Sequence, residues 1–309
     1  MEIKKTVIQK ISVQTAELAY CIFGTGKINL VIEMGLGAVM AEWRPLAERL
    51  AKHHTVLLYE RAGYGSSSAS TLKRTPEHIA DELYRLLQQL DCEEKITLLA
   101  HSQGGLYAQQ FARIYPQHVR NMVLLDPLSP HDSAFQKELT DAEFQKSGVD
   151  KTAGLRLNLR LTRLHLGWFV RLLMKSAPPF YYYPEFTKEE TRSILSAISR
   201  PQIYETALAE YELAHQEQYL QKLRSPVGFP QLPLILVTHD SGIEEQEIRT
   251  FGGASEEEAA KIETLWQRLM CEYLAYSEKS VHIRASQSSH FIHLTDMDLI
   301  CEWLEKSAL

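Results

Sequence analysis

The chain has 309 residues and a formal net charge of −6 at pH 7, with 45% hydrophobic and 23% charged residues. These values are those of an ordinary globular protein that can bury a sizeable core. The acidic balance excludes the strongly basic composition on which nucleic-acid binding usually depends, so we expect no nucleic-acid partner.

The cysteines indicate neither a metal site nor a redox centre. Cys21, Cys92, Cys271 and Cys301 lie far apart, without the short spacing of zinc ligands or of a redox dithiol. We interpret them as free thiols, which fits a reducing compartment. The segment Met1–Tyr20 lacks the apolar run of a signal peptide, and no stretch has the roughly 18–20 apolar residues of a membrane span. We therefore expect a soluble, cytoplasmic protein with no integral membrane segment.

Short apolar runs alternate with helical patterns along the chain, which predicts a mostly parallel sheet covered by helices. The expected strands are Leu18–Phe23, Asn29–Glu33, Thr55–Tyr59, Ile96–Ala100, Asn121–Leu125, Leu234–Thr238 and Val281–Ala285, with Thr6–Val13 as an earlier, antiparallel edge strand. Between them apolar residues recur at helical spacing, as at Trp43, Leu46 and Leu50. A short helix over Asp296–Glu305 is expected to end the chain.

The region from about residue 130 to residue 230 interrupts this alternation. It contains no convincing strand, but it has amphipathic stretches at Asp132–Ser147, Leu155–Lys175, Lys188–Ser199 and Pro201–Leu223. We predict a core formed by residues 1–130 and 231–309 and an inserted helical cap over residues 131–230. Such a cap would cover the carboxyl edge of the sheet, where ligands bind in open α/β folds.

Two features of the cap allow more than one interpretation. The aromatic runs at residues 168–169 and 180–183 could line a substrate pocket or fill the core of the cap. The arginines of the second stretch are Arg156, Arg160, Arg163 and Arg171. They are interpreted either as a solvated face or as an attraction for carboxylated substrates or anionic lipid.

The strongest motif is Ala-His-Ser-Gln-Gly-Gly at residues 100–105, which follows an expected strand and precedes the helix-compatible stretch Leu106–Tyr115. In that context a small-x-Ser-x-Gly sequence forms a sharp turn that exposes the serine hydroxyl. The turn needs small residues two positions before and after the serine, and Ala100 and Gly104 meet this need. We predict Ser102 as a nucleophile, with the Gln103 amide at the start of the next helix as a donor to a developing oxyanion.

Four segments, in this order, resemble those of the α/β-hydrolase superfamily, and the resemblance covers nearly the whole chain except the cap. They are Glu33–Gly37, Glu60–Ser67, His101–Gly105 and Ser289–Leu294. The chain departs from the superfamily pattern at Glu60, Ala100 and Ser289, where Asp, Gly and Gly are commonest. The resemblance implies an α/β-hydrolase fold. It also implies two-step hydrolysis of a small carboxylic ester, thioester or amide through an acyl-enzyme, without a metal or organic cofactor.

The resemblance also assigns roles to individual residues. The Leu36 amide is expected to be the second donor of an oxyanion hole. His290 is expected to be the general base, and His293 to pack behind its loop. Glu60 and Arg61 are expected to form a structural ion pair or to hydrogen-bond the Gly63–Gly65 turn.

Two aspartates compete for the acid that orients the base. Asp240 follows the strand Leu234–Thr238, where the superfamily most often places its acid, but it comes about two residues early. Asp126 ends the strand Asn121–Leu125, which is the acid position in some members. We favour Asp126, keep Asp240 as the alternative, and note that Asp126 could instead cap the turn that contains Pro127.

Two other functions remain open at this point. A proline-iminopeptidase-like aminopeptidase would need cap acids that bind a free amine, for which Glu185, Glu189, Glu205, Glu210 and Glu212 are available. A ligand sensor on the same fold would keep the triad but turn over slowly. The sequence specifies neither the acyl preference nor the oligomeric state.

Overall fold

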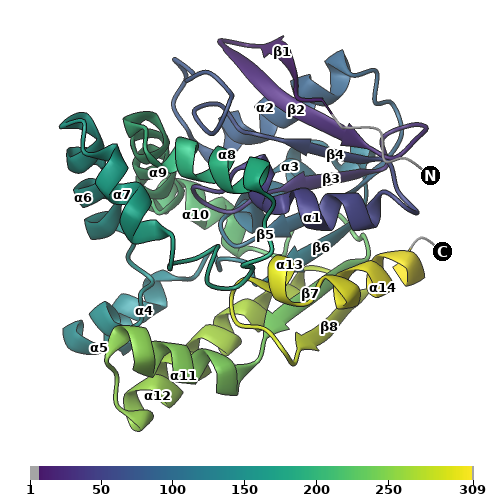
Figure 1. The fold of residues 1–309 in the computed structure, drawn as a ribbon. Helices are drawn as coiled ribbons and strands as arrows, with labels where there is room; N and C mark the ends of the chain where they lie inside the picture. Colours follow the sequence, from purple (N-terminus) through teal and green to yellow (C-terminus); the bar gives the residue numbers. More distant parts are fainter. Residues whose placement is uncertain (1–6, 308–309) are drawn as a thin grey trace.

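The computed structural model describes residues 7–307, and an eight-stranded sheet runs through its centre (Figure 1). The strands are β1 (Gln9–Val13), β2 (Ala16–Phe23), β3 (Leu30–Glu33), β4 (Val56–Tyr59), β5 (Ile96–His101), β6 (Val119–Leu125), β7 (Leu234–His239) and β8 (Ser280–Ala285). Their spatial order is β1-β2-β4-β3-β5-β6-β7-β8. The pairs β1–β2 and β2–β4 are antiparallel and all other pairs are parallel. The predicted mostly parallel sheet with an antiparallel edge is therefore confirmed, although Thr6 lies outside the described residues.

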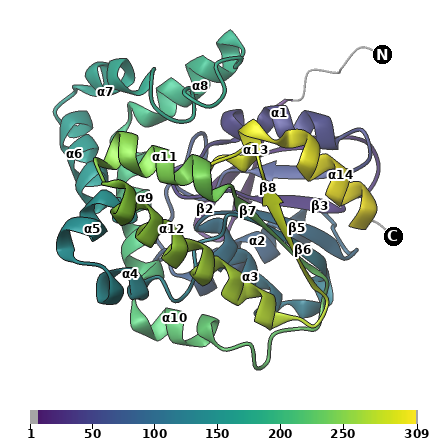
Figure 2. The same cartoon turned by 90° about the horizontal axis from the view of Figure 1, so that it is seen from below.

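Helices cover both faces of the sheet because each inner strand is apolar on both sides. Adjacent residues of β3 show this, since Val31 belongs to one buried cluster and Ile32 to the other. On one face pack α1 (Met40–Leu50), α13 (Ile292–Thr295) and α14 (Met297–Ser307). On the other pack α2 (Pro76–Gln89), α3 (Gly104–Ile114) and η2 (Glu272–Tyr276), and η1 (Pro116–His118) precedes β6 (Figure 2).

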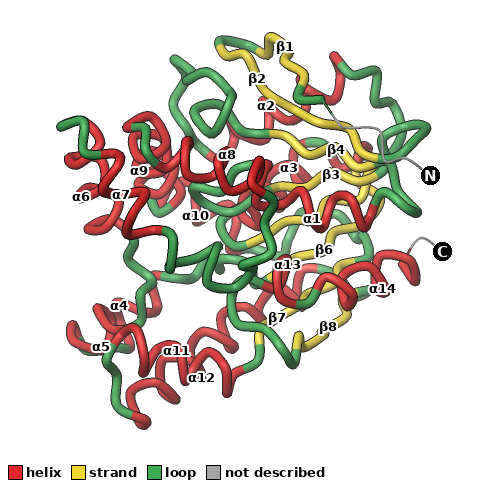
Figure 3. The backbone as a smooth tube through the Cα atoms, viewed as in Figure 1, coloured by secondary structure: helices red, strands yellow, loops and turns green. Residues whose placement is uncertain are grey.

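Between β6 and β7 the described chain forms helices joined by loops, and it contains no strand (Figure 3). The helices are α4 (Ser133–Glu138), α5 (Asp141–Lys146), α6 (Thr152–Arg163), α7 (Gly167–Met174), α8 (Lys188–Ile198), α9 (Pro201–Ala214) and α10 (Glu217–Arg224). Three of the four expected helical stretches are thus divided in two. Thr140 restarts the first with a capping box to Glu143, and His165 leaves the helical region with φ at 61° in the second.

The helices of residues 131–230 pack in three different places. Helices α6–α9, here called the cap helices, gather above the carboxyl edge of the sheet and share its larger buried cluster. Helices α4 and α5 instead join α11 (Ser241–Gly252) and α12 (Glu256–Cys271) in a separate cluster. Helix α10 packs on α3 through Leu220 and Leu223. The boundary of a single inserted cap domain stays a prediction.

The buried guanidinium of Arg61, just after β4, joins the core to the cap helices. Arg61 is 1% exposed, and all five of its N–H donors have partners. They bond the Glu33 carboxylate at the end of β3, the backbone carbonyls of Met34 and Gly35, and both oxygens of Glu210 on α9. One cation therefore holds a strand end, the loop after it and a cap helix together.

Glu210 is anchored from a second side. Arg74 donates to Glu210 and to Glu82, and the Tyr64 hydroxyl donates to Glu210 Oε2 over 2.9 Å. Burial raises the pKa of Glu210, but the charges of Arg61 and Arg74 outweigh it and hold that pKa below its usual value. The buried carboxylate is therefore ionised and paired on both sides.

Glu60 does not pair with its neighbour Arg61. Its carboxylate accepts from the Met40 amide over 3.1 Å and from the Ser66 amide over 2.6 Å. Met40 begins α1, so Glu60 satisfies an unpaired amide at a helix N-terminus, where the helix dipole favours negative charge. Glu60 therefore bonds the amide of Ser66, which directly follows the Gly63–Gly65 turn. Arg61 instead pairs with Glu33 and Glu210, which are distant in sequence.

Replacing Arg61 by alanine should destabilise the fold strongly. The change leaves the buried carboxylates of Glu33 and Glu210 without their main cation, so we expect the free energy of unfolding to fall by about 3–5 kcal/mol. Urea denaturation monitored by circular dichroism measures it. Arg85→Ala is the control, because Arg85 is exposed and its ion pair is with the nearby Asp81 on the same helix. Equal unfolding midpoints for the two variants would contradict a structural role for the Arg61 network.

Candidate active site

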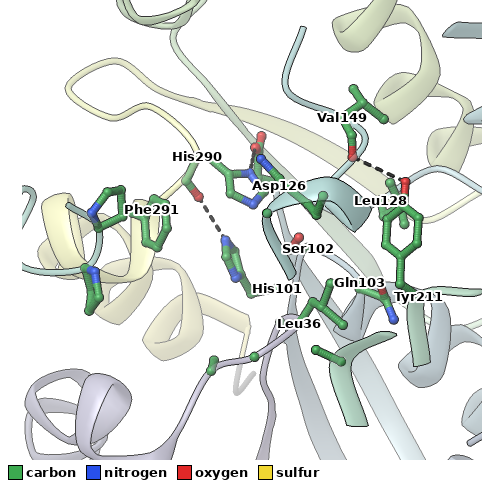
Figure 4. Close-up of a pocket in the computed structure, with 18 of the residues that line it drawn as sticks. Leu36, His101, Ser102, Gln103, Asp126, Leu128, Val149, Tyr211, His290 and Phe291 are labelled. Carbon is green, nitrogen blue, oxygen red and sulfur yellow. Dashed lines mark hydrogen bonds and ion pairs between the residues drawn. The ribbon is translucent and has the colours of Figure 1, made fainter. Parts of the chain in front are cut away.

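Ser102 occupies a sharp turn between β5 and α3. Its φ of 52° lies in the left-handed region that non-glycine residues rarely adopt, and its amide donates to the Leu125 carbonyl over 3.1 Å. A Cβ on Gly104 would lie 2.4 Å from the Glu33 carbonyl oxygen, so the approach of the loop after β3 requires glycine there. The strain and the close packing hold the half-buried serine at the edge of a cavity (Figure 4).

His290 and Asp126 meet beside this turn. Asp126 follows β6 with φ at 45°, and its Oδ2 accepts a 2.6 Å hydrogen bond from His290 Nδ1. Because His290 Nδ1 donates to the carboxylate, Nε2 is the ring nitrogen left to act as a base. Ser102, Asp126 and His290 all line the same cavity. The neighbouring His101 lies nearby but bonds the His290 carbonyl through Nε2 over 2.9 Å.

A second histidine stands behind Asp126. His239, the last residue of β7, donates from Nδ1 to Asp126 Oδ1 over 2.7 Å and from Nε2 to Glu263 Oε2 over 2.9 Å. Burial opposes its charge, but Asp126 and Glu263 raise the pKa of His239 to about 11. The imidazolium in turn outweighs the burial of Asp126 and, together with His290, lowers the pKa of that carboxyl below its usual range. Asp126 is thus held ionised.

Asp240 has a different role. It caps α11, where its Oδ1 accepts from the amides of Gly242 and Ile243 over 3.0 and 3.2 Å. Helix α11 begins at Ser241, one residue after Asp240, so the otherwise unpaired amides of its first turn donate to the Asp240 side chain. The structure brings Asp126, and not Asp240, to His290.

The loop after β3 passes over the serine. An added Cβ on Gly35 would lie 3.3 Å from the Ser102 Cβ. The Gly35 carbonyl points to Arg61, and in a trans peptide the next N–H points the opposite way. The Leu36 amide is therefore turned away from Arg61, and Leu36 lines the cavity. Gln103, at the N-terminus of α3, lines it as well.

His293 lies apart from the reacting groups. Its ring is fully buried, stacks on Trp43 with centroids 3.9 Å apart, and bonds Glu42 through Nε2. Burial lowers the pKa of His293 well below its usual value, so the ring is neutral. The structure places it behind the His290 loop, as the sequence resemblance implies.

The cavity has a volume of about 550 Å³ and a mainly apolar wall. Its apolar lining includes Leu155, Met174, Ile194, Ile198, Ile203, Tyr204, Leu269 and Phe291. A volume of this size suits a small organic ligand. Of the aromatic runs in the cap, Tyr182 reaches the cavity and stacks on Phe291, whereas Trp168 and Phe169 do not line it.

Carboxyl groups of α11 add polarity to this wall. Glu244, Glu247 and Lys151 all line the cavity, and burial lowers the pKa of Lys151 although the charge of Glu244 opposes this shift. Burial raises the pKa of Glu244 to about 7. None of the five cap acids considered for amine binding lines the cavity, and Glu210 is bound to Arg61 and Arg74.

His239 and Glu263 were not identified as site residues from the sequence. They come from β7 and α12, and they are brought together only by the fold. The one available signal was a histidine at the carboxyl end of a strand in a parallel sheet, next to the favoured position of an acid.

Comparison with known proteins gives one family. The family model described as "alpha/beta hydrolase fold" matches residues 28–256. The Caenorhabditis elegans "Abhydrolase domain-containing protein abhd-5.2" is 33% identical over 122 residues, which cover 38% of this chain and 28% of that protein. The Mus musculus "(Lyso)-N-acylphosphatidylethanolamine lipase" is 26% identical over 172 residues, covering 53% of this chain and 49% of the lipase.

The match thus spans less than two thirds of each of these relatives. Among solved structures, the epoxide hydrolase CorEH superposes with a TM-score of 0.67 at 16% identity, covering 98% of both chains. At that identity the likeness concerns the fold alone.

Exchanging each aspartate for asparagine separates the two candidate acids. Asp126→Asn should lower kcat for a p-nitrophenyl ester by about 10⁴-fold, because a neutral amide no longer fixes the tautomer and charge of His290. Asp240→Asn should leave kcat nearly unchanged, since asparagine also caps helices well. Steady-state kinetics and thermal melts of both variants test this. A large loss in a folded Asp240→Asn protein would make Asp126 the wrong choice.

Glu263→Gln tests the role of the second histidine. The amide keeps an acceptor for His239 Nε2 but removes the charge, so the pKa of His239 should fall from about 11 and that of Asp126 should rise. We expect kcat to fall by about tenfold, or about 1.4 kcal/mol of transition-state stabilisation, with KM unchanged. The acid limb of the rate profile should move to higher pH.

The control for this variant is Gln267→Ala, because Gln267 lies on the same helix and its amide donates to the His239 carbonyl rather than to the ring. Stability gives a second readout. The folded pKa of His239 exceeds the unfolded value of about 6.5, so its contribution is complete below pH 6.5 and is lost as the pH rises through 11. Unchanged pH profiles in Glu263→Gln would contradict an electrostatic role for the pair.

Proposed function

Because the chain belongs to the α/β-hydrolase fold family, we propose that it is a serine hydrolase that cleaves a small carboxylic ester, thioester or amide with an apolar acyl group. The observation that carries this proposal is the juxtaposition of Ser102, held at φ 52° after β5, with the hydrogen-bonded pair His290–Asp126 around one cavity.

In the proposed reaction, Ser102 Oγ attacks the carbonyl carbon while His290 Nε2 takes its proton. The amides of Leu36 and Gln103 donate to the oxyanion of the tetrahedral intermediate. The intermediate collapses as His290 returns the proton to the leaving group, which departs and leaves an acyl group on Ser102. Water, deprotonated by His290, then attacks the acyl carbon; as this second intermediate collapses, its bond to Ser102 Oγ breaks, His290 returns the proton to Oγ, and the carboxylic acid leaves. Asp126 stabilises the imidazolium in both steps.

The wall of the cavity supports an apolar acyl group as the part of the substrate that is bound. Most of its lining is aliphatic or aromatic, and Ser102, Asp126 and His290 are among its few polar residues. The mouse relative, whose name describes a lipase of N-acylated phospholipids, supports an acyl substrate too. The proposal stops at this class and does not extend to that lipid.

The chemistry of serine argues against epoxide hydrolysis, although an epoxide hydrolase shares the fold. Attack of a serine alkoxide on an epoxide carbon would form an ether, which water does not cleave under these conditions. Attack on a carbonyl forms an ester, which water cleaves readily. Turnover at Ser102 therefore favours acyl substrates.

The position of Glu244 and Glu247 in the cavity wall favours the proline-iminopeptidase-like alternative. Both line the cavity, and Glu244 Oε2 is buried without a hydrogen-bond partner among the described residues. A free amine could pair with these carboxyls. Lys151 also lines the cavity and interacts electrostatically with Glu244, so it competes with such an amine, and we place this function second.

A fluorophosphonate probe should label Ser102, because the activated hydroxyl attacks phosphorus as it attacks a carbonyl. Peptide mapping identifies the site, and Ser102→Ala and His290→Ala should abolish the label. Ser129→Ala is the matched control, since Ser129 lines the same cavity but bonds the His131 amide. A folded wild-type protein that takes no label would contradict the proposed nucleophile.

Turnover of p-nitrophenyl esters and of prolyl p-nitroanilide then distinguishes the functions. Faster cleavage of the esters is expected, rising with acyl length until the cavity is filled. Preference for the free-amine anilide would favour the aminopeptidase. Labelling without multiple turnovers of any substrate would favour a ligand sensor.

A further inference from the structure

Helices α6 and α7 expose an unusual amount of apolar surface. Large apolar side chains here are between 37% and 69% exposed: Leu157, Leu164, Trp168, Phe169, Leu172 and Leu173. All lie within residues 157–173, at the outer edge of the molecule in both ribbon views (Figures 1 and 2). Exposed apolar residues gathered in this way indicate an interaction surface.

Their spacing puts them on the outward side of each helix. Leu157 and Leu164 are seven residues apart on and just after α6, and Trp168 and Leu172 are four apart on α7, so each pair shares a face. The inner sides of the same helices are occupied, since Val170 is buried in the core and Leu155 lines the cavity. The exposed apolar residues therefore form a second apolar side of each helix, separate from the side that packs on the protein.

The same segment is strongly basic. Residues 151–175 include six lysines and arginines and no aspartate or glutamate, although the whole chain has a net charge of −6. Arg156 and Arg163 pair with Glu212 and Glu205 of α9. Arg160, Arg171 and Lys175 are exposed and form no ion pair with any part of the chain that the structure describes. Arg160 shares the α6 stripe with Leu157 and Leu164, and Arg171 and Lys175 share the α7 stripe with Trp168 and Leu172.

We propose that this face, called the docking face and formed by Leu157, Arg160, Leu164, Trp168, Arg171 and Leu172, binds the surface of an anionic phospholipid bilayer. Helices that combine exposed Trp and Leu with Arg and Lys lie in the interface of such a bilayer. The apolar side chains enter the boundary of the acyl chains, and the basic ones meet the lipid phosphates. Tryptophan suits this depth because its ring is amphipathic.

A second copy of the chain fits the docking face less well. A two-fold symmetric contact would bring the face against itself, and with it the positive charges of Arg160 and Arg171 on both sides. Like charges brought together in this way oppose association, whereas an anionic surface complements them. The charge pattern therefore selects a lipid surface over self-association.

Docking would also place the cavity beside the lipid. Leu155, Asn158 and Met174 line the cavity from α6 and α7, the helices that carry the docking face. An apolar substrate dissolved in the membrane would then reach the cavity across a single layer of helix. This consequence rests on the proposed function, but the docking itself does not.

Sedimentation with vesicles tests the proposal on the full chain. We expect binding to phosphatidylcholine vesicles that contain 30% phosphatidylserine, weaker binding to pure phosphatidylcholine vesicles, and a decrease as salt is raised. Leu172→Glu and the double variant Arg160→Glu/Arg171→Glu should each reduce the partition coefficient at least tenfold. Val227→Glu, at an exposed apolar residue before β7, is the matched control and should bind as the wild type does.

Measurements of ester hydrolysis distinguish membrane docking from the proposed hydrolase function. Leu172→Glu should keep the wild-type rate on a water-soluble ester, and Ser102→Ala should keep its vesicle binding. Two results would overturn docking on lipid. One is a wild-type protein that sediments with neither kind of vesicle. The other is a protein that does not bind vesicles but forms a concentration-dependent dimer, and in which Leu172→Glu abolishes this dimer. That result would make the docking face an interface between copies of this chain.

Discussion

One buried cation, the Arg61 guanidinium, is bound to five acceptors and fixes the loop that passes over Ser102. Arg61 holds the end of β3, the backbone of the following loop and helix α9 at the same time. Because the Gly35 carbonyl is turned toward Arg61, the Leu36 amide is turned the other way. The orientation of a proposed oxyanion donor and the position of the cap thus depend on the same side chain.

Acidic and imidazole side chains alternate along the line of groups behind His290. Glu263 faces His239, His239 faces Asp126, and Asp126 faces His290, with each contact shorter than 3 Å. A buried carboxylate between two imidazoles is more strongly held as an anion than one facing solvent. The arrangement keeps the acceptor for His290 fixed in both charge and direction, which leaves one ring nitrogen for proton transfer.

Local sequence predicted the parts of the site that depend on local geometry. The turn at Ser102 needs a strand, a helix and small flanking residues, all of which can be seen in sequence, whereas Asp126 was favoured only through the resemblance to the α/β-hydrolase superfamily. The partners of Arg61 could not be predicted, because Glu210 lies 149 positions away. The role of His239 could not be predicted either, because its partner Glu263 lies on α12, and the start of α11 at Ser241 makes Asp240 a helix cap.

The way α9 is attached affects how such a protein can diversify. Glu210 joins it to Arg61 and Arg74, and Gln202 bonds the backbone of the turn after β4. The exposed ion pairs between α6 and α9 contribute little to stability by comparison, and the remaining attachment of α6 is apolar, through Leu155, Leu159 and Leu161 on the cluster that α9 shares. Substitutions on the outward side of α6 and α7 can therefore accumulate without disturbing the buried anchor of α9.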